Sequence, residues 1–222
     1  LVIQHKIHFL VEGETPLTMA KSAGLAVSEF ATAFENTKPD IILVIADRYE
    51  SLAIAMAATY MNIAVAHVEG GEISGSIDES IRHAITKLAH LHFPATKDAA
   101  ERIIRMGEEP DSVFCVGSTS IDVLADLDLS NLCAIHDYQK THGVGPAIPL
   151  VSGKYLIVAQ HPVTTEYEQN YRNVQEIAST ISELQLPTIW LWPNMDAGSD
   201  GVSKAIRELR ENMRPDHIHF FK

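Results

Sequence analysis

Four short stretches of the sequence place acidic, basic and amide side chains where a parallel α/β protein binds its ligand. They are Asp47-Arg48-Tyr49-Glu50, Glu69-Gly70-Gly71-Glu72, His161-Pro162 and Pro193-Asn194-Met195-Asp196. Each follows an apolar, β-branched run that we expect to be a strand. A carboxylate base, an arginine and a histidine that converge on one crevice would suit a phosphorylated or nucleotide substrate. Capping of the next helix explains any one such residue equally well, but four together favour a site.

Residues 70–92 combine a glycine-containing loop with a strongly patterned helix. Ser76 and Glu79 have the spacing of a capping box, which predicts that a helix begins one residue after the serine. Asp78 and Arg82 lie four positions apart and share a face of that helix. An exposed ion pair would explain these two residues, but not the Gly-Gly that precedes them. No GxGxxG or GxxxxGK[ST] motif occurs, so neither a dinucleotide site nor a P-loop is indicated.

Eleven histidines raise the question of a metal site. His90 and His92, like His217 and His219, would point both rings to one side of a strand. Neither pair has a carboxylate or cysteine at ligand spacing, so structural histidine is the favoured interpretation and no metal is expected. His161 differs because it follows an apolar strand at the predicted ligand edge, where its ring could steady or protonate a leaving phosphate.

The elements that must position these side chains are strands that alternate with helices. The predicted strands are 41–46, 63–67, 91–95 and 113–117, and then 155–160, 188–192 and 217–221. Such alternation implies right-handed βαβ crossovers in parallel sheets. Ligands of open parallel sheets bind beyond the carboxyl ends of the strands, which is where the polar stretches fall. The sequence therefore predicts an α/β protein with two doubly wound domains.

Five glycines and prolines crowd residues 143–153, and such a density of breakers predicts a linker there. Residues 1–142 are then a Rossmann-like domain that lacks its first βα unit. Residues 154–222 form a second Rossmann-like domain, and with roughly 70 residues it is shorter than a whole domain usually is. We expect both ends of the chain to be cut rather than finished.

Composition excludes several kinds of partner. Among the 222 residues, 29 are acidic and 17 basic, which gives a formal net charge of −12 and disfavours nucleic acid. Polar residues interrupt the uncharged run 51–68, so it predicts a helix, a turn and a strand rather than a membrane span. No signal peptide is visible. Cys115 and Cys133 lack metal or disulfide spacing, so a reducing, cytoplasmic setting is expected.

Several of these stretches resemble a known family. HVEGGEISGSIDESIRHAITKLAHLHF, ADRYE, QHPVTTE and PNMDAGS are similar to the hydrolysing, UDP-releasing branch of the UDP-N-acetylglucosamine 2-epimerases, and the resemblance extends over about 38–199. It implies a fold of the glycosyltransferase-B type, in which two Rossmann-like domains hold a UDP-sugar between them. Residues 154–222 would then belong to the UDP-binding domain. The resemblance also implies a homo-oligomer, dimer or tetramer, and no cofactor.

The implied reaction converts UDP-N-acetylglucosamine and water to N-acetylmannosamine and UDP, the entry to sialic acid synthesis. UDP is eliminated to give a 2-acetamidoglucal, and water then adds with inversion at C2. Because the C2 proton is a weak acid and the leaving group is a diphosphate, a base and cationic ligands are both required. By resemblance, Asp47, Glu69 and Asp78 are the catalytic acids, and which of them moves which proton stays open.

The resemblance also implies the residues that bind substrate. Arg48, His161 and Asn194 match positions that hold UDP, and His161 is placed to favour its departure. Arg82 and His83 are expected to orient Asp78 rather than to react.

The sequence departs from the family in three ways. Ala46 stands where a glycine usually precedes the Asp-Arg pair. Asp200 replaces a lysine that belongs to a feedback site for activated sialic acid in the animal enzyme, so we expect no such feedback. The amino-terminal Gly-Thr/Ser-Arg loop and the carboxyl-terminal Asn-Ser-Ser-Gly segment, which bind phosphate and uridine, are absent, so this polypeptide is not expected to turn over by itself.

Two alternatives stay open. The same chemistry could act on UDP-N,N'-diacetylbacillosamine, but that branch often reads HIHGGE, and Glu69 in its place favours the N-acetylglucosamine substrate. The alternative from another class is a non-catalytic module that binds a UDP-sugar.

Overall fold

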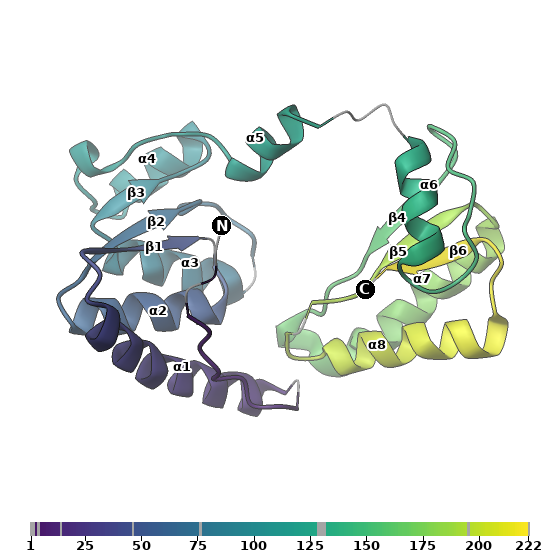
Figure 1. Ribbon diagram of the computed structural model, residues 1–222, viewed down its shortest axis with the longest axis horizontal. Helices are drawn as coiled ribbons and strands as arrows, with labels where there is room; N and C mark the ends of the chain where they lie inside the picture. Colours follow the sequence, from purple (N-terminus) through teal and green to yellow (C-terminus); the bar gives the residue numbers. More distant parts are fainter. Residues whose placement is uncertain are drawn as a thin grey trace. The chain divides into compact units, whose positions relative to one another are not determined.

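The chain forms two compact units, each built on its own parallel sheet (Figure 1). The computed structural model describes residues 3, 5–13, 15–45, 47–75, 77–127, 132–194 and 196–221. Contacts group Leu1–Leu127 in the first unit and Asp128–Lys222 in the second. The alternation of strands and helices in both units confirms the predicted α/β class with two Rossmann-like halves.

The first unit contains three parallel strands among its described residues. Its elements are α1 (Pro16–Thr37), β1 (Ile41–Ile45), α2 (Tyr49–Tyr60), β2 (Ala64–Val68), α3 (Ile77–Leu88), β3 (Leu91–Phe93), α4 (Lys97–Arg105), η1 (Pro110–Ser112) and α5 (Thr119–Ala125). The strands lie in the order β1-β2-β3. The register sets Val44 opposite His67 and Val68 opposite Phe93, so the three strands end at one edge.

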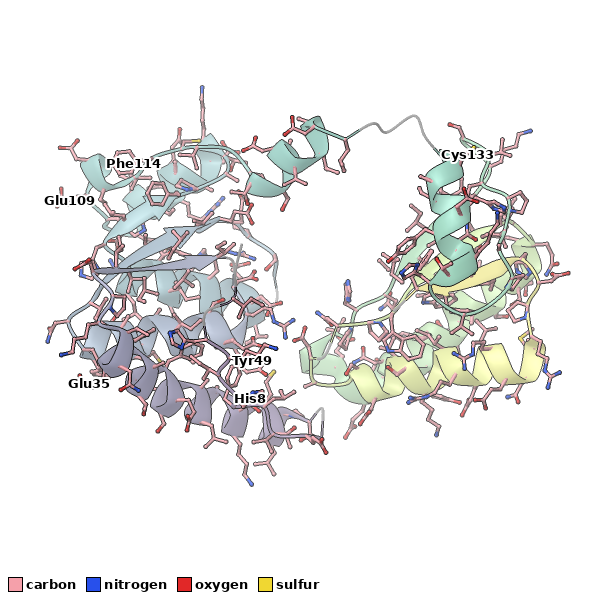
Figure 2. The ribbon with its side chains drawn as sticks, viewed as in Figure 1. His8, Glu35, Tyr49, Glu109, Phe114 and Cys133 are labelled. Atoms are coloured by element: carbon pink, nitrogen blue, oxygen red, sulfur yellow. The ribbon has the colours of Figure 1, made fainter. Side chains whose placement is uncertain are left out.

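The fourth strand predicted at 113–117 is wrong. Only Val113 forms a parallel bridge, to His92, and the N–H of Phe114 donates to the His92 carbonyl at 2.8 Å. The ring of Phe114 stacks on that of Phe93 with centroids 5.7 Å apart (Figure 2). The segment thus follows the edge of β3 without a continuous ladder.

Helices α1 and α2 lie on the same side of the first sheet (Figure 1). The core between helices and sheet is rich in alanine, and its buried members are Phe34, Val44, Ala55, Ala57, Ala58, Val65, Ile85 and Ala89. Small side chains let α2 approach the strands closely, and dense packing of this kind resists any change of volume.

The uncharged run 51–68 is part of α2, a turn and β2, as predicted. Asn62 forms the turn with a positive φ of 57°, a conformation that asparagine tolerates better than most residues. None of the described helices is both long and apolar enough to cross a membrane.

The second unit repeats the α/β pattern. Its elements are α6 (Leu132–Thr141), β4 (Leu156–Ala159), η2 (Thr164–Gln169), α7 (Asn170–Leu184), β5 (Thr188–Leu191), α8 (Ser199–Glu208), the π-turn η3 (Leu209–Met213) and β6 (Ile218–Phe221). The strands are parallel in the order β4-β5-β6. Trp190, fully buried, packs with Ile206 and Phe220 in a core between the sheet and helices α7 and α8.

Residues 143–153, the expected linker, pack against β6. Val144 and Phe220 exchange two backbone hydrogen bonds, of 2.8 and 2.9 Å. The Nδ1 atom of His219 lies 2.9 Å from the carbonyl oxygen of Pro146. The contacts therefore place α6 and this stretch with the second sheet, and the division of the chain differs from the one expected at 142/143.

Packing explains the Gly-Gly pair after β2. Gly71 has a φ of +83°, and a Cβ there would lie 2.5 Å from the carbonyl oxygen of Ala99 in α4. A Cβ at Gly70 would lie 2.8 Å from Nδ1 of His67. Backbone therefore approaches its neighbours here more closely than any side chain allows.

We expect Gly71→Ala to destabilise the first unit more than Gly75→Ala does. Both glycines have positive φ, +83° and +68°, so both alanines meet backbone strain of about 1–2 kcal/mol. Only at Gly71 does the new Cβ also collide with backbone, because no described atom lies within 4 Å of a Cβ at Gly75. Urea unfolding of both variants beside the parent measures the difference, and equal losses would show that the close approach is not tight.

Candidate active site

A cavity of about 380 Å³ opens at the carboxyl ends of the strands of the first sheet. Its lining residues are Asp47, Glu69, Glu72, Arg82, Ala95 and Ser118. Asp47 comes two residues after β1, Glu69 directly after β2 and Ala95 two residues after β3. The shared direction of the strands therefore gathers these residues at the edge where parallel sheets bind ligands.

Arg82 is the charged centre of this cavity. Its residue is 8% exposed, and one guanidinium nitrogen donates to the carboxylate of Asp47. Another donates at 2.7 Å to the carbonyl oxygen of Glu72. A guanidinium out of water requires such partners, so Arg82 fixes the loops that follow β1 and β2. The exposed ion pair considered for Asp78 and Arg82 does not describe this buried arginine.

Glu69 lines the cavity and has an unusual backbone conformation. Its φ is +60°, in the left-handed region that is uncommon for residues other than glycine. Its N–H donates to the carbonyl oxygen of Phe93 at 3.0 Å, which extends the β2–β3 pairing by one residue. Its Oε1 accepts a hydrogen bond of 2.9 Å from the hydroxyl of Ser118. Such backbones persist where surrounding contacts determine them, often at functional sites.

The loop between β2 and α3 is fixed by two glutamates. Glu72 accepts a hydrogen bond of 2.9 Å from the hydroxyl of Thr96 at the start of α4. Glu79 accepts from the N–H groups of Ser74 and Gly75 at 2.9 and 2.7 Å. These two backbone hydrogen bonds lower the pKa of the Glu79 carboxyl. The Glu79 carboxylate thus binds N–H groups four and five residues before it in the chain, whereas a capping box would bind the one three residues before it.

The predicted helix start at 77 is confirmed, but Ser76, its predicted cap, lies outside the described residues.

Three other predicted residues are not among those that line the cavity. Asp78 is half-buried in the first turn of α3, one turn before Arg82. His83 follows Arg82, and its Nδ1 is buried with no hydrogen-bond partner among the described residues. Arg48 stands at the N-cap of α2 and is exposed, with its guanidinium 3.1 Å from the carboxylate of Glu50.

The structure adds Ser118 and Ala95 to the residues expected from the sequence, and it places Glu72, from the polar stretch after β2, in the cavity as well. Ser118 comes directly after the stretch 113–117, which reads as a strand, so the rule that polar groups at strand ends form the site covers it. As a single hydroxyl, Ser118 stands out less in the sequence than the charged stretches do. Nothing in the sequence marks Ala95.

In the second unit, the loops after β4 and β5 meet. The N–H of Asn194 donates to Nδ1 of His161 at 3.2 Å, and its Nδ2 donates to Asp196 at 2.5 Å. A ring nitrogen that accepts a hydrogen bond carries no proton, so His161 holds its proton on Nε2. The Oδ1 atom of Asn194 is buried and has no partner among the described residues. Met195 lies outside the described residues.

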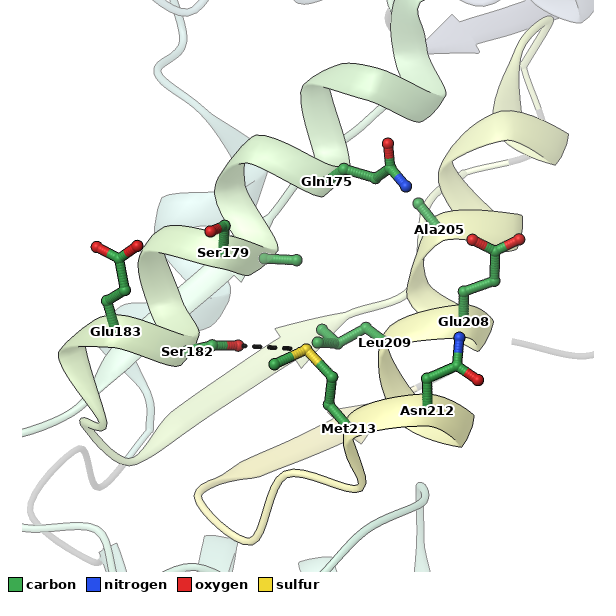
Figure 3. Close-up of a pocket in the computed structure, with 10 residues that line it drawn as sticks. Gln175, Ser179, Ser182, Glu183, Ala205, Glu208, Leu209, Asn212 and Met213 are labelled. Carbon is green, nitrogen blue, oxygen red and sulfur yellow. Dashed lines mark hydrogen bonds between the residues drawn. The ribbon is translucent and has the colours of Figure 1, made fainter.

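A larger cavity, about 480 Å³, lies in the second unit between the second halves of α7 and α8 (Figure 3). Ser182 and Met213 meet across it, with Oγ and Sδ 4.0 Å apart. In βαβ units the helices run against the strands, so these helix ends lie at the amino edge of the sheet. Ligands of parallel sheets bind at the opposite edge, so its size does not make this cavity the candidate site.

Among the described residues, no group of three or more His, Cys, Asp or Glu side chains is arranged to hold a metal ion. His92 lies buried in β3 with its Nε2 3.3 Å from the carboxylate of Glu108. Burial lowers the pKa of its imidazole, so the charged form is disfavoured there. This histidine is part of the packed sheet.

Comparisons with known proteins extend the argument beyond geometry. The family model described as UDP-N-acetylglucosamine 2-epimerase matches residues 1–222. A UDP-N,N'-diacetylbacillosamine 2-epimerase (hydrolyzing) from Legionella pneumophila is 35% identical over 207 residues, 91% of this chain and 52% of the relative. A GDP/UDP-N,N'-diacetylbacillosamine 2-epimerase (hydrolyzing) from Campylobacter jejuni is 30% identical over 219 residues, 98% of this chain and 54% of the relative.

A solved structure shares the fold. The crystal structure of UDP-GlcNAc 2-epimerase from Neisseria meningitidis bound to UDP-GlcNAc has a TM-score of 0.72 at 20% identity. The match covers 96% of this chain and 56% of that one. The chain thus spans about half the length of the curated relatives it matches. Its fold is that of the two-domain glycosyltransferase-B type, and by a family match along the whole sequence the chain belongs to the UDP-N-acetylglucosamine 2-epimerase family.

Proposed function

We propose that the protein releases UDP from a UDP-2-acetamido sugar and inverts C2, by elimination to a 2-acetamidoglucal and addition of water. One observation carries the proposal: Asp47, Glu69 and the buried Arg82 share one cavity at the carboxyl ends of the strands. The family match and the hydrolysing names of two relatives support it.

The two carboxylates have different partners, and this favours different roles. Asp47 is the counter-charge of the buried guanidinium of Arg82. Glu69 is held by a neutral hydroxyl, so it can take up a proton without breaking an ion pair. We therefore assign removal of the C2 proton to Glu69, and to Asp47 the role of holding Arg82.

In the elimination, the C2 proton passes to Glu69, the electrons of the C–H bond form the C1=C2 double bond, and the C1–O bond to UDP breaks. Water then supplies a hydroxyl to C1, and C2 receives a proton on the opposite face. Asp78, one turn before Arg82 on α3, is our candidate for the second proton transfer. His83 stays a proposed orienting residue.

In the second unit we propose that His161 and Asn194 bind the diphosphate. The Nε2–H of a neutral His161 would donate to a phosphate oxygen as negative charge develops there. Arg48 is proposed as a cationic ligand of the same group, because its exposed guanidinium can exchange the carboxylate of Glu50 for phosphate. A homo-oligomer and a cytoplasmic location stay predictions; Cys115 and Cys133 are free thiols.

Two observations bear on which sugar the protein takes. Glu69 in the EGGE stretch favours UDP-N-acetylglucosamine and a route to sialic acid. The two relatives described above both carry the diacetylbacillosamine name, and the Legionella relative has the higher identity, 35%. We therefore propose UDP-N,N'-diacetylbacillosamine as the preferred substrate, with UDP-N-acetylglucosamine as the alternative.

The first prediction is that the full-length protein releases UDP from UDP-N,N'-diacetylbacillosamine with a higher kcat/KM than from UDP-N-acetylglucosamine. Each reaction should yield the free sugar inverted at C2, measured by proton NMR beside a coupled assay for UDP. The reverse order would assign the protein to N-acetylglucosamine. Binding of both sugars without release would favour the non-catalytic module.

Glu69→Gln should lower kcat for UDP release by about 10²–10⁴-fold, the usual contribution of a positioned acid or base. Asp47→Asn should also lower kcat, because the buried guanidinium of Arg82 loses its counter-charge. Binding of UDP, measured by calorimetry, should change little because neither amide removes a cation. Glu101→Gln is the matched control, since Glu101 is an exposed acid on α4. Turnover that survives either cavity substitution would remove that carboxylate from the mechanism.

Arg82→Met should destabilise the first unit by about 3–5 kcal/mol and abolish turnover, because it leaves Asp47 half-buried without its counter-charge. Arg172→Met is the control: its ion pair with Glu176 is exposed, with side chains 82% and 67% accessible, and should contribute less than about 1 kcal/mol. Urea unfolding measures both. Similar losses for the two variants would mean that Arg82 is not a structural charge.

A further inference from the structure

Ser118 stands in a capping position but does not cap its helix. It is the N-cap residue of α5, with an extended backbone at φ −92° and ψ 126°. Serine there normally accepts a hydrogen bond from the first turn of its own helix. Within the described residues, its side chain makes no capping hydrogen bond, and its hydroxyl donates instead to Oε1 of Glu69 at 2.9 Å.

Thr96 shows that one hydroxyl can serve both purposes. At the N-cap of α4 it accepts from the N–H of Ala99 at 3.1 Å. The same oxygen donates to Oε1 of Glu72 at 2.9 Å. A hydroxyl has one donor and two acceptor sites, so donation to a carboxylate does not prevent capping. The rotamer of Ser118 is therefore set by Glu69, 49 residues away in the chain, and not by the helix that it begins.

The main chain of Glu69 is fixed by its surroundings, so only its side chain still needs to be positioned. Its left-handed φ, its N–H bond to Phe93 and the close contacts of Gly70 and Gly71 fix the main chain. A glutamate still has three rotatable side-chain bonds. Ser118 also lines the cavity, and its hydroxyl donates to one carboxylate oxygen of Glu69.

We infer that Ser118 is the positioning residue for the proton-transferring carboxylate of Glu69, an inference that rests on the proposed function. Its hydroxyl donates to Oε1 and so directs the other oxygen toward the C2 proton. In this role Ser118 acts through Glu69 and transfers no proton itself.

The test compares Ser118→Ala and Ser118→Thr in the full-length protein, with UDP release from the UDP-sugar that the parent turns over. Alanine should lower kcat by about 10–100-fold, the contribution of one hydrogen bond to a charged group, with KM nearly unchanged. Threonine keeps the hydroxyl and should restore most of the rate.

Ser112→Ala is the matched control, because that hydroxyl donates to the carbonyl oxygen of Glu109 in a neighbouring turn. It should leave kcat as in the parent. In a Glu69→Gln background, Ser118→Ala should cause no further loss.

The outcomes separate this inference from the function on which it rests. If Glu69→Gln abolishes turnover while Ser118→Ala keeps the parental kcat, the positioning role is wrong and the function stands. Loss of rate that threonine does not restore, or that persists in the Glu69→Gln background, also overturns it, because that is the signature of a structural serine. If the parent releases no UDP, the proposed function fails first and the inference with it.

Discussion

The candidate site depends on one charge held out of water, the guanidinium of Arg82. Removing such a group from solvent costs several kcal/mol unless its donors are satisfied. Its partners belong to different loops, the carboxylate of Asp47 after β1 and the carbonyl of Glu72 after β2. One side chain on α3 thereby joins the ends of two strands. Any displacement of either loop would leave a buried charge unpaired, so the cavity and the stability of this edge depend on the same contacts.

The part of the site that lies at the ends of the strands could be predicted from the sequence. Apolar runs located the strands to within about two residues, and the parallel arrangement put Asp47 and Glu69 at one edge. Patterns could not say which of two adjacent residues faces the cavity. Asp47 lines it, whereas Arg48, the next residue, stands at the start of α2 and pairs with Glu50. That choice is made by the backbone angles of the turn, which composition does not encode.

The glycines of 143–153 have a different role in the structure from the one that the sequence suggested, and the reason is physical. In 143–153 they were taken as breakers of a linker, yet a Cβ at Gly143 would lie 2.3 Å from the carbonyl oxygen of Phe220. At Gly145 the corresponding distance, to the carbonyl oxygen of Ile218, is 2.7 Å. A missing side chain permits close backbone contact as well as free rotation, and only the neighbours decide which is used. The same holds for Gly71 beside α4, where the contact shapes the loop that carries Glu72.

Two departures from the usual local conformational preferences occur where the proposed chemistry takes place. A glutamate adopts the left-handed backbone that favours glycine, a strain of about 1–3 kcal/mol. A serine gives up the cap of its own helix, an interaction worth about 1 kcal/mol. Both departures converge on one carboxylate, that of Glu69, since the serine hydroxyl binds it. Selection for stability alone would favour glycine at the first position and a capping rotamer at the second. That both occur in this chain is best explained by a demand on where that carboxylate points, which is the demand that the proposed proton abstraction from carbon makes.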